Sequence, residues 1–415
     1  MTSVTSTERE FDPFSPSAMD DPYPEYADLH RSDGPHYLEQ RDMWLVTRWD
    51  QVRAGAKNHQ GLSSAEGIAY HRSSLPVLFG IDQPDHTRIR GLIKHEFSPR
   101  GVRIWRPFIE QVCGELLDEA VAVGEIDLVQ QAIILQPVRV ITTIVGVPSD
   151  DLKRLKLTAG VLESFIPNAR VGSPDELEPD DPDESVLRLL AAKNALAGVA
   201  GLVGFLRGLL DKRRAEPARD DLVSKLFAQE EGRISENEIL WLCLSLLVGG
   251  QETMTHFLGN MLDALLNHPD QLRKIRERPE LIGPTIEETA RFYPPVQNCF
   301  RTATTDVRLG DKVIPKGARV ELSFAAGNRD PRKFPDPNNY LVDRVTDGHL
   351  GFGDGIHTCV GAHLARLQAT TFLRMLLERT EDIELIGDLV KVQSPAFRGL
   401  DHLPLRLVPK KTVAA

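Results

Sequence analysis

Residues 352–361 read FGDGIHTCVG, and the chain continues over residues 362–377 as AHLARLQATTFLRMLL, with apolar side chains at helical spacing. A cysteine at the start of a helix faces unpaired backbone N–H groups and the positive end of the helix dipole. Both favour the thiolate, which is the form that binds metals. The glycines of this stretch allow the backbone to come close to a large flat ligand. The stretch therefore predicts a metal-binding thiolate at Cys359.

The other cysteines are Cys113, Cys243 and Cys299, and their spacings match neither a zinc motif nor a CxxC redox pair. We expect these three to be small buried hydrophobic residues. A Gly-x-Gly before a cysteine also occurs in ordinary turns that bury the thiol, so the complete pattern of the loop decides the interpretation of Cys359.

The complete pattern FGxGxHxCxG resembles the haem-binding loop of the cytochrome P450 family. In that family a cysteine thiolate holds the haem iron and favours cleavage of the O–O bond. The resemblance extends from about Asp21 to Leu407. It implies that Cys359 is the axial ligand of haem b (iron protoporphyrin IX), that Phe352 packs close to the ligand sulfur, and that His357 contacts a propionate. Gly361 belongs to the same implied cofactor-binding loop.

Basic residues elsewhere suit the haem propionates. His86 and Arg90 are four residues apart and share one helix face, and this stretch resembles the propionate-binding helix of the family. Arg301, which follows the sequence PPVQNCF, resembles another propionate ligand. Each of these residues taken alone is equally typical of a solvated basic side chain.

Glu288 and Arg291 lie three apart on a predicted helix that Pro294-Pro295 ends, so they can form an ion pair. A surface pair is the common alternative. The order of motifs that follows resembles the ExxR helix and meander of the family, in which Arg344 joins the pair. We interpret the three residues as a buried structural network rather than as catalysts, because buried charges persist only when they are paired.

A long helix is predicted from Ser235 to Asn267, with a capping box at its start and an apolar middle that places it at the centre of the protein. We expect the segment 249–253, GGQET, to interrupt it. Two glycines there cost about 1 kcal/mol each relative to alanine. Space for O2 at the haem or tight helix packing offsets that cost. Glu252 and Thr253 resemble the acid–alcohol pair of the family, with Thr253 activating oxygen and Glu252 delivering protons.

The resemblance also places the walls of a substrate pocket, although apolar residues at these spacings are as typical of a core. The mixture predicts a small, mostly apolar organic substrate with a few polar contacts. The residues expected to face it are Ser245, Val248, Gly249, Val296, Gln297, Asn298 and Phe397.

The fold class that follows is mainly α with small β-sheets (α+β), a cytochrome P450-like fold with a long central helix over the haem. Residues 1–20 are expected to be a flexible N-terminal leader and residues 21–415 a single cytochrome P450 domain. The net charge of -11 argues against nucleic acid as a partner. The sequence contains neither a membrane-spanning run nor a signal core, so we expect a cytoplasmic protein without a membrane anchor. We also expect a monomer.

The implied activity is that of a monooxygenase that inserts one atom of O2 by hydroxylation, demethylation or epoxidation. Since the sequence has no nucleotide-binding GxGxxG motif, electrons must come from a separate ferredoxin-type donor with its reductase. Arg100, Arg103 and Arg366 are candidates for its docking surface. Two alternatives remain, a peroxygenase, which in this family usually lacks the acid–alcohol pair, and a haem sensor or sequestering protein without catalysis.

Overall fold

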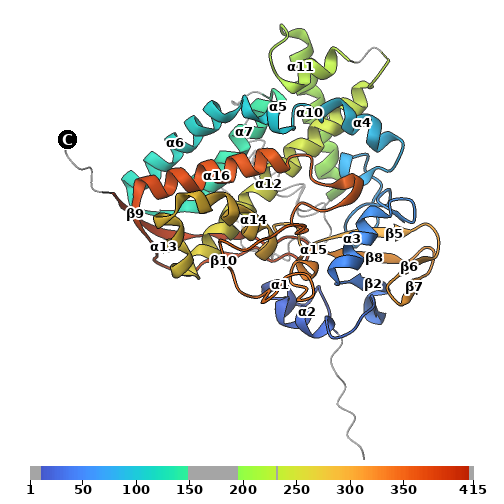
Figure 1. Ribbon diagram of the computed structural model, residues 1–415. Coiled ribbons are helices and arrows are strands. Elements are labelled where there is room, and N and C mark those ends of the chain that lie inside the picture. The colour runs from blue at the N-terminus through green and yellow to red at the C-terminus, as the bar shows by residue number, and fades with distance from the viewer. Residues whose placement is uncertain (1–10, 148–194, 230–231, 411–415) are drawn as a thin grey trace, which may run out of the picture.

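The computed structural model describes residues 11–147, 195–229 and 232–410, and these residues form a helix-rich body with small sheets beside it (Figure 1). The α+β class expected from the sequence is therefore confirmed. The helices are α1 (Pro16–Asp20), α2 (Tyr23–Leu29), α3 (Trp49–Lys57), α4 (Asp85–Ile93), α5 (Pro99–Arg103), α6 (Arg106–Val123), α7 (Leu135–Val145), α10 (Ala195–Ala215), α11 (Leu222–Phe227), α12 (Glu236–Leu266), α13 (Pro269–Glu277), α14 (Ile282–Phe292), α15 (Phe324–Gly327) and α16 (Ala362–Arg379).

Helix α12 is the central element, and its ends follow from local sequence. The Ser235 side chain accepts a hydrogen bond from the Glu238 backbone, and the Glu238 side chain returns one, so the predicted capping box is present. The helix ends just before His268-Pro269, where proline ends the preceding helix. The expected interruption at 249–253 is wrong, because α12 is continuous through both glycines. Glycine weakens a helix without breaking it when tertiary packing supplies the stability.

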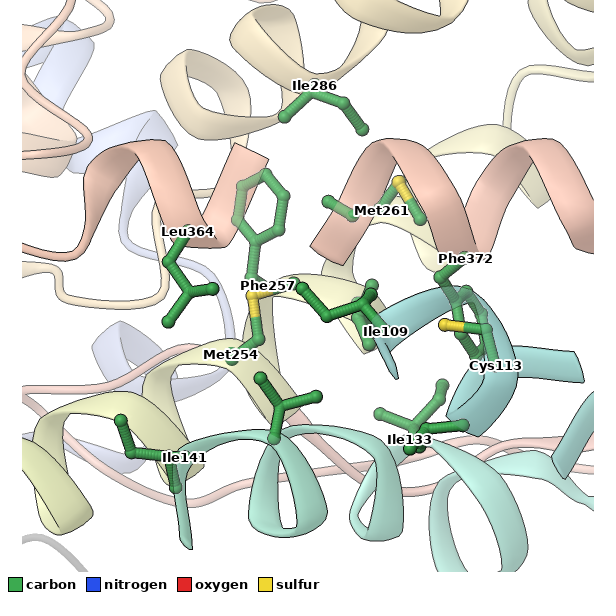
Figure 2. Close-up of a cluster of buried hydrophobic side chains, with 14 of the residues drawn as sticks. Ile109, Cys113, Ile133, Ile141, Met254, Phe257, Met261, Ile286, Leu364 and Phe372 are labelled. Carbon is green, nitrogen blue, oxygen red and sulfur yellow. The ribbon is translucent and has the colours of Figure 1, made fainter. Parts of the chain in front are cut away.

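Helix α12 shares one hydrophobic core with α6, α7, α14 and α16, and Figure 2 shows part of it. Met254, Phe257 and Met261 of α12 lie among side chains from α6, α7, α14 and α16. Each of these three residues is at most 4% exposed. Fully burying such a side chain contributes roughly 1.5–3 kcal/mol. This core fixes α12 relative to α16, the helix that the Cys359 loop enters.

The strands gather at two ends of the helical body: β2, β5 and β8 lie near α3, and β9 lies at the opposite end, near the C-terminus (Figure 1). The largest has the strand order β1-β2-β8-β5-β3, with β2 and β8 parallel and the other neighbours antiparallel. Three smaller sheets have the orders β4-β12-β9, β10-β11 and β6-β7. The strands are β1 (His36–Leu38), β2 (Met43–Val46), β3 (Leu62–Ser63), β4 (Glu125–Asp127), β5 (Asn298–Ala303), β6 (Val307–Leu309), β7 (Lys312–Ile314), β8 (Arg319–Ser323), β9 (Thr380–Leu385), β10 (Val390–Lys391), β11 (Leu400–His402) and β12 (Pro404–Pro409).

The leader expected over residues 1–20 needs a correction, since its second half is structured. Residues 1–10 lie outside the described part of the chain. From Phe11 onward the segment packs on the protein: the Phe11 ring lies 5.8 Å from that of Tyr26, and the Phe14 ring lies 4.9 Å from that of Tyr70. Phe11 and Phe14 pack against buried residues of the largest sheet, and this packing holds the segment on the protein.

Among the described residues, no helix is long and apolar enough to cross a membrane.

Candidate active site

The loop that carries Cys359 is shaped by glycines and by its neighbours. Gly353 and Gly355 have φ values of 67° and 73°, in the left-handed region that favours glycine. A Cβ on Gly355 would lie 2.3 Å from the Ala56 carbonyl oxygen of α3. The Cys359 backbone N–H donates to the Phe352 carbonyl at 2.8 Å, and α16 begins three residues after the cysteine. The loop is therefore a closed turn pressed against α3.

The Cys359 side chain is exposed, unlike the thiols of Cys113 and Cys243, which are buried in the core. It borders a hollow of about 640 Å³ that Arg90, Phe352 and Arg366 also line. Surrounding protein raises the pKa of the Cys359 thiol by desolvation, while the Gly361 backbone N–H and then Arg90 and Arg366 oppose that rise. The sulfur thus has a hydrogen-bond donor and two cations that favour the thiolate.

The ion-pair network predicted on α14 is present and lies close to the loop. Glu288 and Arg291 are both fully buried, and Arg291 Nε lies 2.6 Å from Glu288 Oε2. Arg344 Nε lies 3.1 Å from Glu288 Oε1. Arg291 Nη1 also donates to the Asn328 carbonyl at 3.0 Å, and the Asn328 side chain accepts from the Leu350 N–H. The network therefore fixes the segment that enters the Cys359 loop.

Three predicted propionate ligands lie on one buried side of that loop. The rings of His86 and His357 are in edge contact at 4.4 Å, and Arg301 lies near enough to lower the pKa of His357. Burial and then Arg301 lower the pKa of His357 to about 3; burial and then Arg90 lower that of His86 to about 4. Among the described residues, both ring nitrogens of His86 and Nδ1 of His357 are buried without a hydrogen-bond partner. A neutral imidazole carries one N–H, and on each of these rings that N–H can donate to an anionic group.

Arg90 was expected to bind a haem propionate, but part of its guanidinium already binds the protein backbone. Its guanidinium Nη2 donates to the Thr358 carbonyl at 2.6 Å, in the loop itself, and the side chain lines the hollow beside Cys359. One of its donors is therefore engaged with protein backbone, and its charge acts on both His86 and Cys359.

Helix α12 presents an open stretch at Gly249. This residue is exposed, and a Cβ added to it would meet no described atom within 4 Å. A Cβ on Gly250 would instead lie 2.8 Å from the Ile141 side chain of α7. Tight helix packing therefore explains Gly250, whereas Gly249 has open space beside it. Thr253 is half-buried one turn later, and its Oγ1 donates to the Gly249 carbonyl at 2.5 Å.

Glu252 is buried, and its carboxylate Oε1 lies 3.4 Å from His256 Nε2. His256 was not singled out from the sequence, although the spacing of four residues is the one that brings side chains together on a helix.

The residues predicted to face the substrate differ in what their side chains do. The Ser245 hydroxyl is already used: it donates to the Trp241 carbonyl at 2.6 Å and accepts from the Leu78 N–H at 2.9 Å. The Gln297 and Asn298 amides, both buried, donate to the carbonyls of Pro294 and Pro395. The structure therefore assigns these three polar side chains to backbone contacts that shape the site.

The apolar residues among those predicted to face the substrate make no hydrogen bonds through their side chains, so their surfaces can contact a substrate. Val248 and Val296 are half-buried, and Val296 forms an isolated β-bridge with Phe397, which brings the two segments together. Phe397 is also half-buried, with its ring 5.9 Å from that of His256.

Two further residues were missed. Ser64 Oγ lies 3.2 Å from His357 Nε2, and Glu287 of α14 binds Arg366 of α16 through contacts of 2.6 and 2.8 Å. Hydrogen bonds from Arg366 and His349 lower the pKa of Glu287 to about 2 even though burial raises it. No local signal marks Ser64, since its partner lies far away in the sequence.

Comparison with known proteins agrees with this geometry. The family model described as "Cytochrome P450" matches residues 201–381. The chain is 33% identical over 406 residues to the beta-dihydromenaquinone-9 omega-hydroxylase of Mycobacterium tuberculosis, covering 97% of this chain and 79% of that protein. The chain belongs to the cytochrome P450 family. It is thus a cytochrome P450 monooxygenase, an oxidoreductase that acts with O2 and needs a redox partner.

Other P450 proteins match over nearly their whole length. The vitamin D(3) 25-hydroxylase of Pseudonocardia autotrophica is 32% identical over 426 residues, which cover 99% of this chain and 100% of that protein. The crystal structure of CYP109E1 from Bacillus megaterium in complex with testosterone has a TM-score of 0.82 and 27% identity, and the match covers 95% of this chain and 99% of that one. The P450 fold expected from the sequence is therefore confirmed.

The residues present fit the haem that the family implies. An exposed thiol in a closed loop can ligate iron, and buried unpartnered imidazole nitrogens beside a buried arginine can bind carboxylates.

Proposed function

We propose that this P450 uses haem b to insert one oxygen atom from O2 into a small, mostly apolar organic molecule, with electrons from a ferredoxin-type donor and its reductase. The observation that carries the proposal is the placement of Cys359, exposed at the end of a rigid loop while the ring nitrogens of His86 and His357 are buried without partners. A ligand with a metal centre and anionic edges satisfies both features.

Cys359 would hold the iron, and His86, His357 and Arg301 would hold the propionates. Bound haem supplies the site at which O2 is activated, with the thiolate favouring O–O cleavage. Arg90 has a double role, since it donates to the Thr358 carbonyl and its charge stabilises the thiolate. Glu288 pairs with Arg291 and Arg344, and both arginines also donate to backbone carbonyls. This network would keep the Cys359 loop in place.

Thr253 and Glu252 would deliver the protons that oxygen activation requires. The Thr253 hydroxyl lies beside the open stretch at Gly249 and holds a proton on Oγ1, close to the space for O2. The Glu252 carboxylate is buried one residue earlier on α12, where it can accept a proton on Oε1 and pass it on. This division of work follows the acid–alcohol resemblance, and it argues for O2 rather than peroxide as the oxidant.

An apolar substrate is supported by the side chains that remain free of internal hydrogen bonds. Val248, Val296 and Phe397 offer apolar surface, while the polar groups of Ser245, Gln297 and Asn298 are engaged. The relatives named for vitamin D(3) and for a complex with testosterone act on or bind molecules that are mostly hydrocarbon. Pockets lined in this way bind such molecules by burial of area.

In this proposal the electron donor would dock at the hollow beside Cys359. Arg100 and Arg103 are exposed on α5, which packs against α16, and Pro99 of the same helix lines the hollow. Arg366, proposed from the sequence as a third docking cation, is ion-paired with Glu287, so it is less available to a docking protein. An acidic ferredoxin would therefore meet Arg100 and Arg103 first.

The experiment is to incubate the purified haem protein with compounds chosen by their effect on the haem spin state. One arm supplies ferredoxin, reductase and NAD(P)H, and the other supplies hydrogen peroxide alone. We expect oxygenated product, identified by mass spectrometry, in the first arm. Product with peroxide alone would favour a peroxygenase, and no product from a broad panel in either arm would favour a haem sensor.

A further inference from the structure

The proton-handling acid of α12 is held by a second buried titratable side chain. Glu252 is 7% exposed and His256 is 3% exposed, and Oε1 of the first lies 3.4 Å from Nε2 of the second. A buried carboxylate needs hydrogen-bond donors, because burying a charge without them is costly. The imidazole N–H is such a donor, one helical turn further along α12.

His256 is in turn seated by the C-terminal turn that carries Phe397. A Cβ added to Gly399 would lie 2.1 Å from His256 Nδ1, so glycine is the residue that leaves room for the ring. The turn itself is fixed to α12, because the Asn260 side chain donates to the Arg398 carbonyl at 2.9 Å. The Phe397 ring of the same turn lies 5.9 Å from the ring of His256.

We propose that His256 is a positioning residue that holds the Glu252 carboxylate for proton delivery, and that Gly399 is required to let it do so. The proposal rests on the proposed function, since it assigns a partner to the acid of the acid–alcohol pair. The Nε2–H of His256 donates to Glu252 Oε1 and selects one orientation of a flexible side chain. Without that donor the carboxylate is held less firmly in this orientation and delivers protons less often during oxygen activation.

The test compares three substitutions in the haem-loaded protein. The Gln amide nitrogen has the same reach from Cβ as imidazole Nε2, whereas the Asn amide nitrogen has the reach of Nδ1. We expect His256→Phe to lower product formed per electron consumed by roughly tenfold, the scale of one lost hydrogen bond to a charged group, with peroxide released instead. His256→Gln should restore most of the coupling, and His256→Asn much less.

Gly399→Ala provides an independent perturbation that keeps the imidazole. Its methyl group displaces the ring, so it should uncouple turnover as His256→Phe does. In all four variants haem content and the substrate-induced spin shift should stay within about twofold of the parent, since a hydrogen bond to Glu252 is not a substrate contact. A solvent deuterium isotope effect that grows in His256→Phe but not in His256→Gln would place the defect in proton delivery.

Full coupling in His256→Phe, or equal uncoupling in His256→Phe and His256→Gln, would overturn the positioning role. These results differ from a failure of the proposed function, in which the parent protein itself forms no product with donor and O2.

Discussion

Glu321 on β8 is a buried acid whose effect on stability can be measured. It is fully buried, and its strand neighbours include Leu45 on β2 and Phe300 on β5. Neither carboxylate oxygen has a hydrogen-bond partner among the described residues. Burial raises the pKa of Glu321 from 4.5 to about 8, opposed more weakly by Asn298. We therefore expect the folded protein to carry this group protonated at neutral pH.

The sign and size of the effect follow from proton linkage. Between about pH 4.5 and about pH 8 the folded chain keeps the proton and the unfolded chain does not, so stability falls as pH rises. A pKa difference of one unit corresponds to about 1.36 kcal/mol, so the free energy of unfolding should fall by roughly 5 kcal/mol across this window. Glu321→Gln keeps the shape and removes the charge, so it should abolish that loss.

The assay is the thermal midpoint of the haem-loaded protein measured at about pH 5 and about pH 8. We expect Glu321→Gln to match the parent at the lower pH and to exceed it by several degrees at the higher pH, which is about 1 °C per kcal/mol for a chain of this length. Glu381→Gln, an exposed glutamate of β9, is the control and should leave the parent's curve unchanged. An equal difference between Glu321→Gln and the parent at both pH values would refute the reasoning.

Three further substitutions test the site. Glu288→Gln leaves Arg291 buried without its counter-charge, so it should destabilise the protein by about 3–5 kcal/mol and lower the yield of haem-loaded protein; a normal yield and thermal midpoint would contradict the network. Thr253→Ala should release peroxide in place of product, and unchanged coupling would remove Thr253 from oxygen activation. Gly355→Ala should lower haem retention, because its Cβ meets the Ala56 carbonyl and its φ is strained; full retention would show that the loop tolerates both.

The sequence predicts well those features that depend on neighbouring residues. The capping box of α12 and the His268-Pro269 stop lie next to the ends that they determine, and the structure ends the helix where they indicate. The Cys359 loop is equally local, since its glycines set its backbone. The long helix was placed correctly, although its expected interruption was wrong because two glycines do not outweigh the packing of α12.

Features that depend on distant partners could not be predicted. Strand β5 (Asn298–Ala303) was not predicted, because it is defined by pairing with β8. Ser245 was assigned to the substrate pocket, but its hydroxyl binds the Leu78 backbone far away in the chain. The sequence predicts that Arg90 shares a helix face with His86. It does not predict that Arg90 donates to the Thr358 carbonyl, because that contact depends on how the chain folds.

The central claim is that the thiolate of Cys359 holds the haem iron, and the absorption spectrum of the reduced protein with carbon monoxide tests it most directly. The parent protein and a Cys299→Ser control should show the red-shifted band that is the signature of thiolate-ligated haem, and Cys359→Ser should lose it. A parent that binds no haem, or a Cys359→Ser protein that keeps the band, would contradict the account.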